Sequence, residues 1–193
     1  MRVLVACEFS GRVRDAFLAK GHDALSCDLE PTEVPGPHYQ GDVRDLLSEK
    51  WDMMIAFPPC TYLAQSGMHW TRSGKRPYRL TLEALDFVRL LFAAKIEKLC
   101  LENPVGMIGT EIKRPTQIIQ PFQFGHNESK KTCLWLRGLP QMVPTKIMNK
   151  PPDGRWVNQG PTGTTIDQPG PMRSKQRSRT YEGIALAMGD QWG

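Results

Sequence analysis

Cys60 and Glu102 have side chains that could act together as a nucleophile and a proton donor. Cys60 follows the uncharged apolar run 53–57, which predicts a buried strand. Pro58 and Pro59 cannot extend a hydrogen-bonded ladder, so the thiol is presented just beyond the carboxyl end of that strand. Ligands bind at this edge of parallel α/β sheets. Taken alone, a cysteine after a strand is more often a small core residue than a nucleophile.

Glu102 ends a second apolar run, residues 98–101, which also predicts a buried strand. Burial there favours the protonated carboxyl, which could donate a proton. One predicted helix lies between the two strands, and a right-handed crossover would make the strands neighbours. Thiol and carboxyl would then face one pocket. The alternative is that Glu102-Asn103-Pro104 only caps a strand and begins a turn.

The segments that must position these residues alternate between strand and helix patterns. Strands are predicted at 3–7, 24–27, 53–57, 98–101, 117–124 and 132–136, and helices at 12–20, 80–95 and 181–192. This alternation predicts an α/β fold, a Rossmann-like doubly wound and mostly parallel sheet with helices on both faces.

Three further features should lie at the same sheet edge. The Ser10-Gly11 turn leads into a helix whose N-terminus suits a ligand carboxylate or phosphate. Asp28 closes the second strand, where a carboxylate can accept hydrogen bonds from ribose hydroxyls. Asp42 closes a third strand-like piece and could accept from an adenine amino group. Each has an ordinary alternative as a turn or cap residue, but together they predict an adenosine pocket.

The turn at Gly11 lacks the further glycines of a pyrophosphate-binding loop, because Arg12-Val13-Arg14 follows it. This argues against NAD or FAD. A nucleoside cofactor without pyrophosphate fits better, and we expect S-adenosylmethionine. The residues expected to contact it are Phe9, Ser10, Gly11, Asp28, Leu29, Asp42, Val43 and Pro58.

Composition narrows the class of protein. The chain has 193 residues, enough for one domain, and a formal charge of +5, which is compatible with a polyanionic partner. Five cysteines without paired spacing and four scattered histidines predict a reduced, cytoplasmic protein with no disulfide scaffold and no metal site. No run approaches the ~18 apolar residues of a membrane helix, and no signal-peptide pattern precedes the first strand.

Segment 67–79 interleaves cations with aromatic rings, a pattern suited to phosphate contact and base stacking. The alternative is a solvated surface loop. A second basic segment, 173–179, could grip phosphates without reading sequence. The expected nucleic-acid contacts are Trp70, Arg72, Lys75, Arg76, Arg79, Arg177 and Arg179.

These residues together resemble a family, the DNA cytosine-5 methyltransferases. The resemblance is carried, in order and approximate spacing, by Phe9-Ser10-Gly11, Asp28, Asp42, Pro59-Cys60 and Glu102-Asn103. Gln65-Ser66-Gly67 and Arg79-Leu80 also resemble the residues that come after the Pro-Cys motif in that family. The likeness runs from Val3 to roughly Leu136 and implies one methyltransferase-like domain, residues 1–193.

The resemblance implies a covalent mechanism that uses S-adenosylmethionine. Cys60 would add to C6 of a cytosine while Glu102 protonates or hydrogen-bonds N3, so that C5 can take the methyl group. Phe9 would lie against the adenine, Asp28 would hold the ribose and Asp42 would meet the adenine edge. A cytosine in duplex DNA would have to be flipped out to reach Cys60.

The chain departs from the family at the motif that holds the cytosine O2. Lys130-Lys131 stands before strand 132–136 in place of glutamine and paired arginines, so either lysine could replace them, and Lys131 is the candidate. Gln176-Arg177-Ser178-Arg179 matches the motif in letters but lies late in the chain, where its arginines suit phosphates better.

A second departure is size, because the loop-rich, basic segment 140–179 stands in place of a target-recognition domain. The substrate could be DNA read with short or relaxed specificity, or a free deoxycytidine nucleotide such as dCMP. A partner subunit could also read the sequence. Another pyrimidine-modifying transferase and an inactive nucleic-acid-binding relative are further alternatives, and the oligomeric state stays open.

Overall fold

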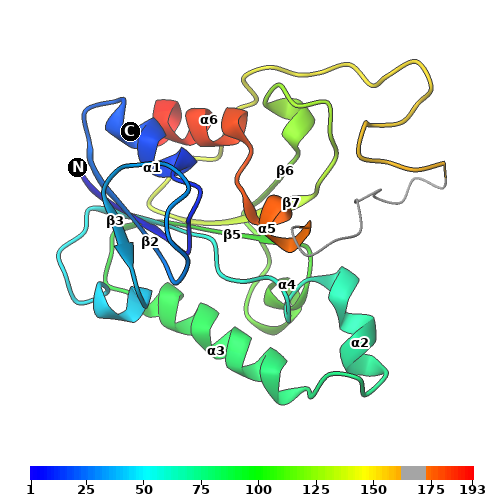
Figure 1. Ribbon diagram of the computed structural model, residues 1–193, viewed down its shortest axis with the longest axis horizontal. Helices are drawn as coiled ribbons and strands as arrows, with labels where there is room; N and C mark the ends of the chain where they lie inside the picture. The colour runs from blue at the N-terminus through cyan, green and yellow to red at the C-terminus, as the bar shows by residue number, and fades with distance from the viewer. Residues whose placement is uncertain (162–172) are drawn as a thin grey trace.

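A seven-stranded sheet lies between two layers of helices in the computed structural model, which describes residues 1–161 and 173–193 (Figure 1). The strand order is β3-β2-β1-β4-β5-β7-β6. The strands are β1 Arg2–Ala6, β2 Asp23–Asp28, β3 His38–Gln40, β4 Met53–Ala56, β5 Lys98–Pro104, β6 Gln117–Ile119 and β7 Thr132–Arg137. All neighbouring pairs are parallel except those of β7, which is antiparallel to β5 and to β6. The predicted doubly wound, mostly parallel sheet is confirmed.

Helices cover both faces of this sheet. They are α1 Arg12–Leu18, α2 Met68–Arg72, α3 Arg79–Ala93, α4 Met107–Glu111, α5 Arg173–Ser178 and α6 Glu182–Trp192, with short 3-10 helices at Val43–Asp45, Gln65–Gly67 and Pro121–Gln123. Helices α1 and α6 pack against each other on one face, while α3 and α4 lie on the other (Figure 1). No helix in the described ranges is long and apolar enough to span a bilayer.

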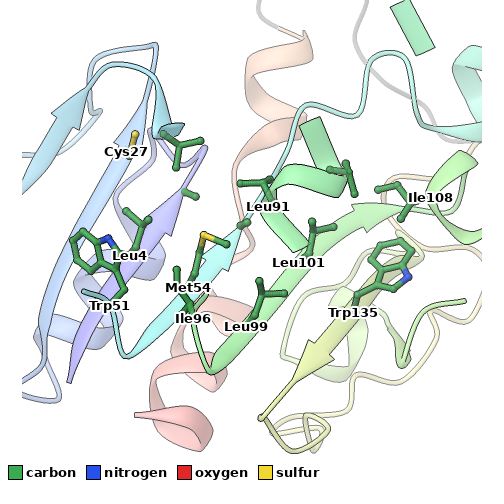
Figure 2. Packing of buried hydrophobic residues seen from close by; sticks show 14 of the residues in the cluster. Leu4, Cys27, Trp51, Met54, Leu91, Ile96, Leu99, Leu101, Ile108 and Trp135 are labelled. Atoms are coloured by element: carbon green, nitrogen blue, oxygen red, sulfur yellow. The ribbon is translucent and has the colours of Figure 1, made fainter. Parts of the chain in front are cut away.

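The strand sequences are apolar throughout because both faces of the sheet are buried. In β1, Val3 and Val5 face the α1–α6 layer, and Leu4 and Ala6 face the α3 layer. Figure 2 shows the second of these clusters, in which Leu4, Met54 and Leu101 come from three adjacent strands. Core packing on both sides therefore fixes the carboxyl ends of β1, β4 and β5 relative to one another.

Three local expectations differ from the structure. Segment 67–79, expected as a loop, contains α2, which the buried side chain of Met68 anchors. Strand β6 is shorter than predicted because Pro121 cannot donate to the ladder and begins a 3-10 turn. Strand β5 is longer than predicted, since β7 continues to pair with it through Pro104, so Glu102 lies within the strand.

Candidate active site

Cys60 is held just beyond β4, at the edge of the sheet where the parallel strands end. Phe57 N donates to the Ala6 carbonyl oxygen at 2.9 Å, and Asn103 Nδ2 donates to the Pro58 carbonyl oxygen at 2.7 Å. After Cys60 the chain turns, with its carbonyl oxygen accepting from Leu63 N at 3.0 Å. The thiol itself keeps an exposed surface.

Glu102 lies on the neighbouring strand, as the right-handed crossover predicts. Strand β5 pairs with β4 up to Leu101 and with β7 beyond it, where Glu102 stands opposite Leu134. Burial raises the pKa of the Glu102 carboxyl, and the Lys130 ammonium opposes this shift. The carboxyl is therefore a proton donor held closer to neutrality than a free glutamate.

Cys60, Glu102 and Lys130 act on one another electrostatically. Surrounding protein raises the pKa of the Cys60 thiol, the Glu102 carboxylate raises it further, and the positive charges of Lys130 and Arg177 lower it. The Glu102 carboxyl therefore acts on the thiol electrostatically, but Cys60 is not among the residues that line the cleft containing Glu102, so a shared pocket for thiol and carboxyl stays a prediction. A neutral Glu102 and a nearby cation are the conditions under which Cys60 ionises most easily.

The structure places Lys130, rather than Lys131, beside Glu102. Lys130 lines a cleft together with Glu102, Thr132 and Tyr181, and its Nζ donates to the Arg177 carbonyl oxygen at 2.9 Å. Lys131 is exposed and does not line this cleft. The cleft holds a cavity of about 20 Å³, room for roughly one water molecule.

The acids expected to hold a nucleoside gather at the ends of β2 and β3. Burial raises the pKa of the Cys7 thiol, at the end of β1, and the nearby charges of Asp28 and Asp42 raise it further. Asp28 accepts from Glu30 N at 3.0 Å, and Asp42 accepts from Arg44 N at 2.9 Å. Burial raises the pKa of Asp28, as expected for a carboxyl partly enclosed by protein.

The N-terminus of α1 is occupied by the protein's own carboxyl group. Glu8, which is 4 % exposed, accepts from Arg12 N at 3.0 Å and also from the hydroxyl of Ser10. The expectation that this helix end would hold a ligand carboxylate or phosphate is therefore wrong. The sequence signal for this internal capping is an acid three residues before a glycine turn.

Gly11 is required for packing. Its φ of 76° lies in the left-handed region, and a Cβ there would lie 2.5 Å from Val34 Cγ2 and 2.6 Å from an Arg14 guanidinium nitrogen. Arg14 is fully buried and holds the loop that contains Val34, a role that no local sequence pattern indicates.

The remaining expected cofactor contacts divide into two groups. Phe9 is 7 % exposed, and Leu29 is 73 % exposed directly after β2, an apolar surface next to Asp28. Val43 is part of the core, and Pro58 is buried beneath the Cys60 loop. The aromatic ring, the exposed leucine and the two carboxylates at neighbouring strand ends are side-chain types that would suit the adenosine part of S-adenosylmethionine.

Residues 175–181, which we call the C-terminal strap, cross this edge of the sheet. Lys175 Nζ lies 5.0 Å from the centroid of the Phe9 ring and 3.6 Å from a Glu30 carboxylate oxygen. Arg179 donates to both carboxylate oxygens of Glu33 at 2.7 Å. The strap therefore joins the predicted cofactor side to the cleft that contains Glu102, whose lining includes residues 178–181.

The expected nucleic-acid contacts lie mainly on α2 and the turn that follows it. Trp70, Arg72 and Lys75 are exposed, with Lys75 Nζ 4.7 Å from the Trp70 ring centroid. Arg76 donates to the Thr61 carbonyl oxygen at 3.1 Å and so also supports the segment after Cys60. Arg79 begins α3 and pairs with a glutamate one turn later.

No cluster of His, Cys, Asp and Glu that could hold a metal ion occurs in residues 1–161 or 173–193.

No known protein family matches the chain, and no curated protein matches it. Solved structures of other proteins, however, are similar to it in fold. The Entamoeba histolytica methyltransferase EhMeth is similar with a TM-score of 0.50 and 14% identity, covering 77% of this chain and 57% of that one.

A protein assigned as a DNA modification methyltransferase, encoded within a prophage of E. coli, is similar with a TM-score of 0.47 and 13% identity, covering 77% of this chain and 52% of that one. The chain thus spans little more than half the length of these proteins. At such identities the likeness establishes the α/β fold that methyltransferases share.

Proposed function

We propose that this chain is an S-adenosylmethionine-dependent methyltransferase that acts on cytosine C5 in DNA through a covalent adduct of Cys60. The observation that carries the proposal is the electrostatic coupling of Cys60, just beyond β4, with Glu102 of β5 and with Lys130. The resemblance to the cytosine-5 family and the methyltransferase-type fold support it.

The reaction follows from what each side chain can do. Cys60 loses its proton to solvent and adds as thiolate to C6, while Glu102 gives its proton to N3. C5 thereby becomes nucleophilic enough to take a methyl group. Loss of the C5 proton to water then restores the C5–C6 double bond and expels the Cys60 thiolate, and Glu102 recovers the N3 proton.

S-adenosylmethionine, when bound, supplies an electrophilic methyl group. Phe9 and Leu29 would contact its adenine, Asp28 its ribose hydroxyls and Asp42 its adenine edge. Phe9 follows β1, which adjoins β4, whereas Asp28 and Leu29 stand at the end of β2 and Asp42 follows β3, one and two strands further from the Cys60 loop.

Lys130 takes the place of the family's O2-binding arginine in this proposal. Its ammonium would donate to O2 of the ring that Glu102 protonates at N3, and its charge favours the Cys60 thiolate. The bond from Lys130 to the Arg177 carbonyl oxygen keeps the ammonium at the cleft. Lys131, the exposed neighbour, is the matched control for this role.

A nucleic-acid substrate is supported by the exposed cations and rings of the α2 region. Phosphates would be held by Arg72, Lys75 and Arg79 and a base would stack on Trp70. Arg177 and Arg179 of the C-terminal strap would contact the backbone nearer the cleft. A free deoxycytidine nucleotide is the second candidate, because the cleft is almost closed and a small substrate needs less opening.

The test is to offer labelled S-adenosylmethionine with duplex DNA, single-stranded DNA and dCMP side by side, and to measure tritium release from cytosine labelled at C5. We expect transfer to DNA with tritium release, and we expect Cys60→Ala to abolish both while leaving cofactor affinity intact. Turnover by Cys60→Ala would refute the covalent mechanism. Transfer to dCMP alone would select the free nucleotide, and cofactor binding without any release would indicate an inactive relative.

A further inference from the structure

The cleft that contains Glu102 is too small for the base that the proposed reaction needs. Its cavity of about 20 Å³ holds roughly one water molecule, whereas a ring the size of benzene needs a cavity on the order of 150 Å³. A cytosine can therefore reach Glu102 only if one wall of the cleft moves. The walls are the sheet and the segment before β7, the C-terminal strap that includes the end of α5, and α6 (Figure 1).

Two of these walls are fixed by packing. Glu102 belongs to β5, which stays paired with β7 beyond it. Ile184 and Met188 of α6 are buried in the core, where α6 packs against α1. At the start of α6, a Cβ on Gly183 would lie 1.9 Å from the Phe124 carbonyl oxygen, so the beginning of this helix is also tightly placed.

The C-terminal strap is the wall that can move. In the part of the chain that the structure describes, residues 175–180 form no backbone–backbone hydrogen bond with another segment. Side chains hold the strap instead. The Arg12 guanidinium donates to the Thr180 carbonyl oxygen at 2.7 Å, and Lys130 Nζ donates to the Arg177 carbonyl oxygen at 2.9 Å. Such bonds can be exchanged for others without disrupting a strand or a helix.

Arg179 and Glu33 form the best-defined of these contacts. Two guanidinium nitrogens of Arg179 donate to the two carboxylate oxygens of Glu33, each at 2.7 Å. The hydrogen bond from Arg179 holds the pKa of the Glu33 carboxyl below its usual range, and the charges of Lys175 and Arg12 act in the same direction. Glu33 therefore stays ionised and keeps the strap attached to the loop after β2.

Glu33 has a group that a phosphate could replace. A guanidinium binds a carboxylate or a phosphate through the same pair of parallel hydrogen bonds, so Arg179 would lose little in exchanging one for the other. The Arg179 and Glu33 side chains are 28 % and 24 % exposed, and ion pairs that water reaches are of modest strength. Lys175, whose Nζ lies 3.6 Å from a Glu30 carboxylate oxygen, offers a second such exchange.

We propose that the C-terminal strap is a lid on the cleft, that Glu33 holds it shut through Arg179, and that a backbone phosphate of DNA opens it by replacing Glu33. The inference rests on the proposed action on DNA and adds its regulation. The lid would pivot at Tyr181, whose hydroxyl donates to a Glu128 carboxylate oxygen at 2.6 Å. A lid that is shut in most molecules lowers the apparent affinity for DNA in proportion to the open fraction.

The position of the strap can be measured as the distance between two spin labels. The background is Cys60→Ala, which removes the exposed native thiol and, in the proposed mechanism, prevents turnover. The labels are attached at Gln176→Cys in the strap and at Leu90→Cys on α3, both at exposed positions. We expect double electron–electron resonance to give one main distance for the free protein and a different one with saturating duplex DNA.

Variants of the ion pair separate the lid from a general effect of charge. Glu33→Ala should show the second distance without DNA and should bind DNA roughly three- to tenfold more tightly. Arg179→Ala should also show the second distance without DNA, but it should bind DNA more weakly than Glu33→Ala because it lacks the phosphate contact. Glu49→Ala, which loses an ion pair to Arg2 at the start of β1, should behave like the parent protein in both measurements.

The lid is refuted if Glu33→Ala without DNA keeps the distance of the parent protein, or if saturating DNA leaves that distance unchanged. Methyl transfer to DNA is measured separately with protein that retains Cys60. Transfer by a protein whose strap does not move would refute the lid and leave the proposed function standing. A strap that opens on DNA, without transfer to any cytosine substrate, would uphold the lid and refute the proposed reaction.

Discussion

Asn103 Nδ2 donates a hydrogen bond of 2.7 Å to the carbonyl oxygen of Pro58 and thereby ties the strand of Glu102 to the loop of Cys60. Asn103 is 1 % exposed, so this bond is shielded from water. The two candidate catalytic groups are thus positioned by adjacent strands and also by a direct connection between their flanking residues.

Asn103→Ala should therefore leave the position of the Cys60 thiol relative to the Glu102 carboxyl less firmly fixed. The buried Pro58 carbonyl oxygen would lose its donor, which costs about 1–3 kcal/mol in the free energy of unfolding. We expect methyl transfer to fall by more than cofactor affinity does, measured by single-turnover kinetics and calorimetry. Asn149→Ala, exposed and remote, is the control. An unchanged transfer rate in Asn103→Ala would show that the tie has no part in positioning Cys60.

The reactivity of Cys60 reports the charges around it without any substrate. The Glu102 carboxylate raises the pKa of the thiol and the Lys130 ammonium lowers it. Glu102→Gln should lower that pKa and speed alkylation at a fixed pH near 8 by about two- to tenfold, because more thiolate is present. Lys130→Gln should raise the pKa and slow alkylation by a similar factor.

Lys131→Gln is the matched control for this alkylation experiment, and it should leave the rate unchanged. Cys60 is the exposed cysteine among the five, so Cys60→Ala supplies the background. Equal rates in wild-type protein, Glu102→Gln and Lys130→Gln would mean that the three side chains do not form one site.

Cofactor affinity should respond in opposite directions to two substitutions at the predicted adenosine pocket. Asp28→Ala removes the expected ribose acceptor and should weaken binding of S-adenosylmethionine. Lys175→Ala frees the Phe9 ring from the ammonium that lies over it and should strengthen binding about two- to fivefold, the equivalent of one exposed cation–π contact.

Calorimetry measures both changes, and Lys20→Ala, which loses only a surface ion pair to Asp190, is the control. Affinity unaltered by Asp28→Ala would remove that residue from the pocket. Weaker binding in Lys175→Ala would show that the lysine assists the cofactor instead of competing with it.

Arg14 should be among the residues most important for stability. Its guanidinium donates to Asp15, Ser26, Thr32 and the carbonyl oxygens of Val34 and Pro35. A lysine cannot reproduce this fork of donors, so Arg14→Lys should lower the free energy of unfolding by at least about 2 kcal/mol. Urea denaturation measures the loss. The exposed Arg89→Lys should change stability by less than ~0.5 kcal/mol, and an equally small effect of Arg14→Lys would contradict this role.

Local patterns were sufficient to predict the sheet and to place Cys60 and Glu102 at neighbouring strands. Strand β4 was recognisable because its apolar run ends at two prolines, and the alternation of strand and helix predicted which strand would lie next to it. That Glu102 lies on the strand next to the one that precedes Cys60 followed from this alternation. This prediction needed no knowledge of contacts between segments that are distant in the sequence.

Features that depend on distant segments could not be predicted in this way. The choice between Lys130 and Lys131 depends on which side chain faces the cleft, and the partner that holds Lys130 lies in the C-terminal strap, 47 residues later. Buried Arg14 finds its acceptors in the loop after β2. Residues 162–172 of the expected loop-rich insertion lie outside the described residues.

The carboxyl group of Glu8 at the start of α1 has a consequence for the proposed choice of cofactor. Nucleotide-binding proteins commonly neutralise a pyrophosphate with backbone N–H groups at such a helix start, and here the Arg12 N–H already donates to an internal acceptor, Glu8. A diphosphate arriving at this helix would meet an occupied position and, whenever Glu8 is ionised, a like charge. We therefore expect this helix start to disfavour diphosphate-bearing cofactors and so to select against them, in addition to any contact that favours S-adenosylmethionine.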